Sequence, residues 1–140
     1  MFTVILPTFN ECENLERFVN RLQEVFADNQ LDGHIIVVDD GSPDGTGEIA
    51  ETLANSHDNL SVIHRRAKQG IGPAYVAGFK QALATETSFI FEMDCDFSHD
   101  PANIPAFLEA IRSADLVLGS RYVPGGRVEN WGLTRRLISR

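Results

Sequence analysis

The sequence predicts an α/β protein with an open, mostly parallel sheet and helices on both faces. Two observations predict it. Short apolar runs rich in β-branched or aromatic residues recur along the chain, at 4–6, 35–38, 61–63, 89–91 and 116–118. Such runs are typical of buried strands. Helical patterns separate them, and strands that alternate with helices imply right-handed βαβ units.

The expected helices follow from apolar spacing and from residues that favour helix starts. The first is the most regular, because apolar residues at i, i+3, i+4 and i+7 run from 15 to 26. Asn10, with Glu13 three residues later, is expected to cap its start. The other three helices are shorter, and their markers are Ile49 with Leu53, Pro73 at a helix start, and the apolar residues after Pro101.

Composition narrows the class of protein. A chain of 140 residues, 43% of them hydrophobic and 23% charged, fits one folded domain. No apolar run approaches the roughly 20 residues of a membrane span, and the start lacks the features of a signal peptide. A formal charge of −8 argues against nucleic acid as a partner. Two cysteines match neither a disulfide framework nor a zinc site, which indicates a reduced, cytoplasmic setting.

The charge is unevenly spread along the chain. Residues 121–140 hold five arginines and one glutamate, so the first 120 residues are more acidic than the whole. Two interpretations stay open for this basic tail. It binds anions such as phosphates, or it forms a solvated helix face or a patch for lipid headgroups.

Acidic residues follow two of the expected strands. In parallel α/β sheets ligands bind beyond the carboxyl ends of the strands, so Asp39, Asp40, Asp94 and Asp96 should gather on one rim. Oxygen ligands of this kind suit Mg²⁺ or Mn²⁺, which one or two carboxylates hold together with substrate phosphates. In an extended segment Asp94 and Asp96 would also point the same way. The alternative is that all four are ordinary turn and helix-cap residues.

Two glycine-containing segments follow other expected strands. Residues 40–46, Asp-Gly-Ser-Pro-Asp-Gly-Thr, are dense in turn-forming residues ahead of a helix. Residues 70–75 lack the last glycine of a dinucleotide fingerprint and follow the third strand, so no nicotinamide or flavin site is expected. The glycines there would let Lys68 and the loop backbone approach a phosphate.

Taken in order, these motifs resemble the inverting family 2 glycosyltransferases of GT-A fold, and more narrowly the polyprenol (dolichol) phosphate mannose synthases. The motifs lie at 7–11 (Pro-Thr-Phe-Asn-Glu), 38–46, 68–72, 93–99 (Met-Asp-Cys-Asp-Phe-Ser-His), 119–122 (Gly-Ser-Arg-Tyr) and 125–140. The resemblance runs from residue 3 to residue 140. It implies one GT-A nucleotide-sugar-binding domain over 1–140, without the C-terminal part of the full-length enzyme.

The resemblance also implies roles for individual residues. Those that would hold the guanine and ribose of GDP-mannose are Pro7, Phe9, Glu11, Val38 and Asp40, and Lys68 would lie near a phosphate. Asp94, Cys95 and Asp96 match an Asp-Ala-Asp motif, in which Asp96 would bind the metal most directly and Cys95 would contribute its backbone. Ser98 stands where some relatives have a glutamine beside the metal. Those that would hold the diphosphate or the acceptor phosphate are Arg121, Arg135 and Ser139.

The expected reaction is transfer of mannose from GDP-mannose to a polyprenyl phosphate, with Mg²⁺ or Mn²⁺ as cofactor and Asp96 and Arg121 as catalytic residues. A lipid phosphate is already ionised near neutral pH, so it needs arginines rather than a general base. The protein would act at the cytoplasmic face of a membrane, with a separate anchoring subunit or domain left open. Two alternatives remain: another donor or acceptor, such as UDP-glucose, or a non-catalytic nucleotide-sugar-binding module.

Overall fold

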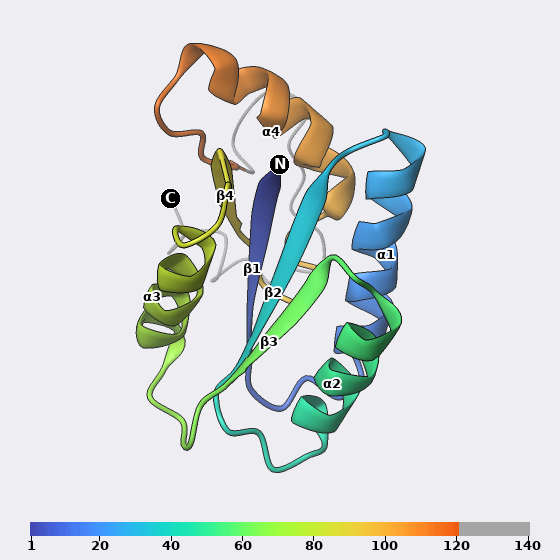
Figure 1. The fold of residues 1–140 in the computed structure, drawn as a ribbon, viewed down its shortest axis with the longest axis vertical. Helices are drawn as coiled ribbons and strands as arrows, with labels where there is room; N and C mark the ends of the chain where they lie inside the picture. The colour runs from blue at the N-terminus through green and yellow to red at the C-terminus, as the bar shows by residue number, and fades with distance from the viewer. Residues whose placement is uncertain (121–140) are drawn as a thin grey trace, which may run out of the picture. The chain divides into compact units, whose positions relative to one another are not determined.

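A parallel sheet is the centre of the structure, a computed structural model that describes residues 1–120 (Figure 1). Its strands are β1 (Phe2–Thr8), β2 (Gly33–Asp39), β3 (Leu60–His64) and β4 (Phe89–Glu92). They lie in the order β3-β2-β1-β4, and every neighbouring pair is parallel. The predicted α/β class and parallel sheet are confirmed. The chain divides into two units, Met1–Pro105 and Ala106–Arg140, and the first contains the whole sheet.

Helices cover both faces of this sheet, as the sequence predicts. Figure 1 shows α1 (Leu15–Asp28) and α2 (Thr46–Ser56) on one face and α3 (Ile71–Ala82) on the other. Beneath α3 the core cluster contains Ile5, Ile36, Val38, Ala74 and Ala82. Helix α3 lies very close to β1, because a Cβ added at Gly78 would come within 2.5 Å of Ile5 Cγ2. This close fit fixes the distance between α3 and the face of the sheet.

The predicted cap of α1 is wrong. The helix begins at Leu15 with Asn14 at its N-cap, because residues 12–14 first form a turn. Asn10 instead adopts a left-handed conformation with φ of 59°, and its backbone N–H donates to Ser42 Oγ. The predicted apolar face itself is confirmed, since Leu15, Phe18, Val19 and Leu22 are fully buried.

Short helical elements follow the sheet. The 3₁₀ turn η1 (Pro101–Asn103) leads into α4 (Ile104–Ala110) and a second turn, η2 (Ile111–Ser113). The predicted strand at 116–118 is wrong: this segment is irregular, and Leu116 and Leu118 are 71% and 77% exposed. An apolar run becomes a strand only where a neighbouring strand pairs with it, and among residues 1–120 β4 pairs with β1 alone. None of the helices in this range is long and apolar enough to cross a membrane.

Candidate functional site

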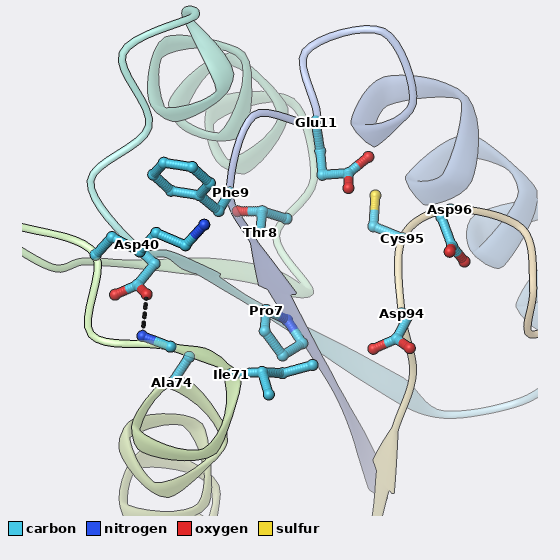
Figure 2. A pocket seen from close by; sticks show the side chains of 12 residues that line it. Pro7, Thr8, Phe9, Glu11, Asp40, Ile71, Ala74, Asp94, Cys95 and Asp96 are labelled. Carbon is cyan, nitrogen blue, oxygen red and sulfur yellow. Dashed lines mark hydrogen bonds between the residues drawn. The ribbon is translucent and has the colours of Figure 1, made fainter.

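A pocket of about 240 Å³ opens at the carboxyl ends of β1, β2 and β4 (Figure 2). It brings together eight of the residues that the sequence predicts for a site: Pro7, Phe9, Glu11, Asp40, Lys68, Asp94, Cys95 and Asp96. It also contains Gly70, which the sequence places beside Lys68 near a phosphate, and three residues that the sequence reasoning gave no role, namely Thr8, Ile71 and Ala74. Ile71 and Ala74 lie one helical turn apart at the start of α3, so the helix spacing after Gly70 could have indicated them.

Other predicted residues lie elsewhere. Val38 is fully buried in the core beneath α3, and in the sheet it stands beside Pro7. Ser98 is exposed and donates its backbone N–H to Asp96 Oδ1 at 2.8 Å. Arg121, Arg135 and Ser139 lie outside the described residues, so their roles stay predictions.

Asp40 lies in one wall of the pocket, and its carboxylate is engaged by donors from the protein itself. Its side chain is only 5% exposed and pairs with Arg65, whose Nη1 lies 2.6 Å from Asp40 Oδ1. Its other oxygen, Oδ2, accepts the backbone N–H groups of Gln69 and Gly70, both at 2.9 Å. A buried carboxylate needs such donors to offset its lost hydration. Asp40 therefore fixes the loop that leads into α3.

That loop places Lys68 beside Phe9. The Lys68 ammonium lies 3.9 Å from the centre of the Phe9 ring, within the range of a cation–π interaction. The two predicted ligand-binding residues thus contact each other. A cation beside an aromatic face offers both an electrostatic partner for a phosphate and a surface for a flat ring.

The turn-rich segment 40–46 clamps the loop after β1. Three consecutive N–H groups of that loop, those of Asn10, Glu11 and Cys12, donate to side chains of this segment, at Ser42, Thr46 and Asp44 respectively. Sequence reasoning expected turn residues here but could not show that their partners lie more than 30 positions away.

Asp44 is the central acceptor of this clamp. Its Oδ1 accepts both the backbone N–H and the hydroxyl of Thr46, and its Oδ2 accepts the N–H of Cys12. Desolvation alone would raise the pKa of Asp44, but these hydrogen bonds from Thr46 and Cys12 lower it well below the ordinary carboxyl value. The clamp therefore depends on an ionised carboxylate.

Asp39 does not line this pocket, although all four predicted carboxylates lie at the carboxyl edge of the sheet. Consecutive residues at a strand end point to opposite faces of the sheet, and Asp39 faces away from Asp40. Its oxygens accept the Ser42 N–H at 3.3 and 3.4 Å and lie 3.8 Å from His64 Nδ1. It lines a second hollow of about 230 Å³ with Ser42, Gly47, Glu48, Glu51 and His64. Three of the four predicted acids remain in the first pocket.

The acidic segment after β4 forms the opposite wall. It is not extended as predicted, because residues 95–99 form a bend in which Phe97 has a φ of 61°. Asp94 is half-buried and directed into the pocket, whereas the exposed Asp96 carboxylate lies within the bend (Figure 2). The Phe97 ring anchors the bend by packing edge-on against Phe18, with centroids 5.1 Å apart. The two carboxylates therefore reach the pocket from different directions.

Ionisation differs between the residues of this segment. Partial burial would raise the pKa of Asp96, but hydrogen bonds from Ser98 and the charge of His99 lower it. Burial, followed by the charges of Glu11, Asp96 and Asp94, raises the pKa of Cys95 to about 12. Asp96 is therefore an anionic oxygen donor, and Cys95 is an unreactive thiol at neutral pH.

The residues present fit a divalent metal ion that a ligand helps to hold. Within residues 1–120 no three His, Cys, Asp or Glu side chains form a metal cluster by themselves. Two carboxylates, Asp94 and Asp96, nevertheless line the same pocket. Mg²⁺ and related hard cations are commonly bound by one or two carboxylates together with substrate phosphates, which is the arrangement that this donor set allows.

The fold and the site together define a parallel α/β protein with an acidic ligand pocket at the carboxyl edge of its sheet. The family model of glycosyl transferase family 2 matches residues 3–140. The chain belongs to this family, as the resemblance predicts.

Curated relatives share nearly half of their aligned residues with this chain. An undecaprenyl-phosphate mannosyltransferase of Micrococcus luteus is 46% identical over 96% of this chain and 54% of its own length. A polyprenol monophosphomannose synthase of Mycolicibacterium smegmatis is 49% identical over 98% of this chain and 51% of its own. A dolichol-phosphate mannosyltransferase of Pyrococcus furiosus is 44% identical over 99% and 38%. The chain thus spans about half or less of the length of these relatives.

Solved structures agree on the fold. TarS of S. aureus, residues 1–349 in complex with UDP-GlcNAc, has a TM-score of 0.64 at 24% identity over 88% of this chain and 36% of its own. This likeness confirms the expected GT-A fold, and at this level of identity it supports no conclusion about the ligand. A mannosyltransferase of Pyrobaculum calidifontis in complex with GDP-Man and Mn²⁺ has a TM-score of 0.52 at 26% identity, over 58% of this chain and 24% of its own.

Proposed function

We propose that this chain forms the donor-binding part of a polyprenyl-phosphate mannosyltransferase, which moves mannose from GDP-mannose to a polyprenyl phosphate. The observation that carries the proposal is the pocket whose lining combines Asp94 and Asp96 with Phe9 and Lys68 (Figure 2). The names of relatives that are 44–49% identical to this chain favour a polyprenyl phosphate acceptor and mannose as the sugar. The Pyrobaculum complex, with GDP-Man and Mn²⁺, favours this donor and a divalent cation.

The two walls of the pocket suit different parts of the donor. The Phe9 ring offers a flat apolar surface, and the loop that Asp40 fixes offers backbone groups. Together with Pro7 and Glu11, this part of the pocket suits the guanine and ribose. Asp94 and Asp96 suit the diphosphate end, where they would hold Mg²⁺ or Mn²⁺. When bound, the cation would neutralise the charge that builds up on the leaving GDP. Lys68, beside the Phe9 ring, supplies a further positive charge within the same pocket.

The acceptor needs positioning rather than deprotonation. A phosphate monoester is largely ionised at neutral pH, which agrees with a pocket wall whose thiol, Cys95, is held protonated. We assign the acceptor phosphate to Arg121, Arg135 and Ser139, because the forked donors of arginine suit phosphate oxygens. Because a polyprenyl phosphate resides in a bilayer, we propose that the protein acts at the cytoplasmic face of a membrane.

Nucleotide binding tests the donor. We expect GDP with Mn²⁺ to raise the melting temperature of the 140-residue chain, and UDP with Mn²⁺ to raise it less, in a thermal shift assay. Chelation of the cation should remove most of the GDP effect, because without it the Asp94 and Asp96 carboxylates would repel the diphosphate. A larger stabilisation by UDP than by GDP would overturn the GDP-mannose assignment.

Transfer of labelled mannose from GDP-mannose to a short polyprenyl phosphate tests the activity. We expect labelled lipid product that depends on Mg²⁺ or Mn²⁺ and that fails to form when the acceptor is the uncharged polyprenol. Tight GDP binding without transfer at any metal concentration would instead identify a nucleotide-sugar-binding module.

A further inference from the structure

Tyr75 contacts the acidic wall of the pocket from α3. Its hydroxyl donates to Asp94 Oδ1 at 3.2 Å, across 19 residues of sequence. Tyr75 is not among the residues that line the pocket, so it contacts Asp94 without forming part of the pocket surface. Neither the sequence motifs nor the proposed function assigns a role to this residue.

The position of the Tyr75 hydroxyl is set by the core. Its ring packs against the cluster of Ile5, Ile36 and Val38 beneath α3. The helix itself is fixed above β1, because Gly78 leaves no space between the two. A tyrosine held in this way has little freedom, so its hydroxyl is a fixed point against which a neighbouring carboxylate can be oriented.

Asp94 is held at its backbone as well. Its N–H donates to His99 Nδ1 at 3.0 Å, and the preceding residue, Met93, continues the ladder by donating to the Ile5 carbonyl at 3.2 Å. The backbone of Asp94 is therefore fixed by His99 and by β1. Its carboxylate can still rotate about the side-chain bonds, and the Tyr75 hydroxyl restrains that rotation.

We propose that Tyr75 is a positioning residue that orients the Asp94 carboxylate for a divalent cation; this inference rests on the proposed function. The Asp94 side chain is directed into the pocket (Figure 2), and its Oδ1 accepts the Tyr75 hydroxyl, so that Oδ2 is not engaged by this bond. Carboxylates that bind metal ions are commonly held by such outer hydrogen bonds, and loss of one costs about 10- to 100-fold in metal affinity or activity. Tyr75 touches neither cation nor substrate in this role.

The test is Mn²⁺ affinity in the presence of GDP, followed by the electron paramagnetic resonance signal of free Mn²⁺. We expect Tyr75→Phe to weaken Mn²⁺ binding about 10-fold and to leave metal-free GDP binding unchanged. The matched control is Gln81→Met, which removes a 2.9 Å hydrogen bond between the same helix and Ser61 at a distance from the pocket. That variant should lower the melting temperature without changing Mn²⁺ affinity.

A double-mutant cycle separates orientation from general loosening of α3. In an Asp94→Asn background, Tyr75→Phe should cause little further loss of Mn²⁺ affinity, because the hydroxyl acts through the carboxylate that is already gone. Equal losses in both backgrounds, or no loss in either, would overturn the proposal for Tyr75. If the unmodified chain with GDP binds no Mn²⁺ at all, the proposed function fails first, and the inference fails with it.

Discussion

Two acidic segments follow strands in this sheet, and they are built in opposite ways. At the end of β2, the Asp40 carboxylate is buried and receives donors from Arg65, Gln69 and Gly70. After β4, the Asp96 carboxylate is exposed and receives the N–H of Ser98 from its own bend. In the sequence both look alike, as acids directly beyond an apolar run.

This difference indicates that the Asp40 wall shapes the pocket, whereas the Asp96 wall can bind a cation. A carboxylate whose donors are all supplied by the protein is stabilised in place and organises its surroundings. An exposed carboxylate with a lowered pKa stays ionised and accessible to a cation. We infer that Asp40 acts through the loop that it fixes, whereas Asp96 acts on a ligand directly.

The largest expected effect is that of Asp40→Ala on stability. Removal of Asp40 leaves Arg65, whose side chain is only 11% exposed, without its counter-charge, and breaking a buried pair costs about 3–5 kcal/mol. We expect a loss of this size in the free energy of unfolding, measured by urea denaturation. Replacing both partners, as Asp40→Ala with Arg65→Met, should be less destabilising than Asp40→Ala alone. A loss below about 1 kcal/mol, the scale of an exposed ion pair, would contradict a structural role for Asp40.

The contrast between Asp39 and Asp40 explains what the sequence could predict. The position of both acids just after an apolar run placed them at the correct edge of the sheet. The fold class followed from the alternation of strands and helices. Which acid faces the pocket depends on the strand register and on Arg65 and residues 69–70, which are 25 to 30 positions further along. Strand alternation indicates that Asp39 and Asp40 point to opposite faces, but contacts of that separation leave no local signal for which of the two faces the pocket.

The second expected effect is that of Asp96→Ala on nucleotide binding. If Asp96 binds the cation directly, the loss of Mn²⁺-dependent GDP affinity should exceed the roughly 100-fold upper range for an outer hydrogen-bonding partner. Isothermal titration of GDP with and without Mn²⁺ measures this loss. Ser98→Ala keeps the backbone N–H that Asp96 accepts and removes only the hydroxyl bond that helps to lower the pKa of Asp96, so its effect should be much smaller. A comparable loss in Ser98→Ala would show instead that the serine hydroxyl is a ligand.

The bend at 95–99 shows where local patterns gave the wrong geometry. An Asp-x-Asp after a strand predicts an extended segment, yet Phe97 adopts a left-handed conformation that is rare for a bulky residue. The ring is held there by Phe18 of α1 and lies 5.3 Å from the Arg17 guanidinium. A packing site on a distant helix thus overrides the local preference, and it gives Asp94 and Asp96 their different directions.

The smallest expected effect concerns the pH dependence of stability. It involves Asp44, which clamps the loop after β1. Because the folded pKa of Asp44 lies below its unfolded value, its ionised form contributes stability above about pH 4, the ordinary aspartate value. That contribution is lost as the pH falls through the folded pKa. Asp44→Asn removes the charge but keeps an acceptor, so at neutral pH it should cost about 1 kcal/mol or less, the scale of an exposed capping bond.

Melting temperatures of the unmodified chain and of Asp44→Asn, taken from pH 7 to pH 3, measure this contribution. The difference between them should be constant at neutral pH and should shrink as the pH falls below about 4, because the unmodified chain then loses the charge that the variant lacks. Asp58→Asn, at an exposed position, serves as the control for a simple change of net charge. A difference that widened at low pH would contradict the lowered pKa. A pH-independent difference would mean that Asp44 acts through its shape and not through its charge.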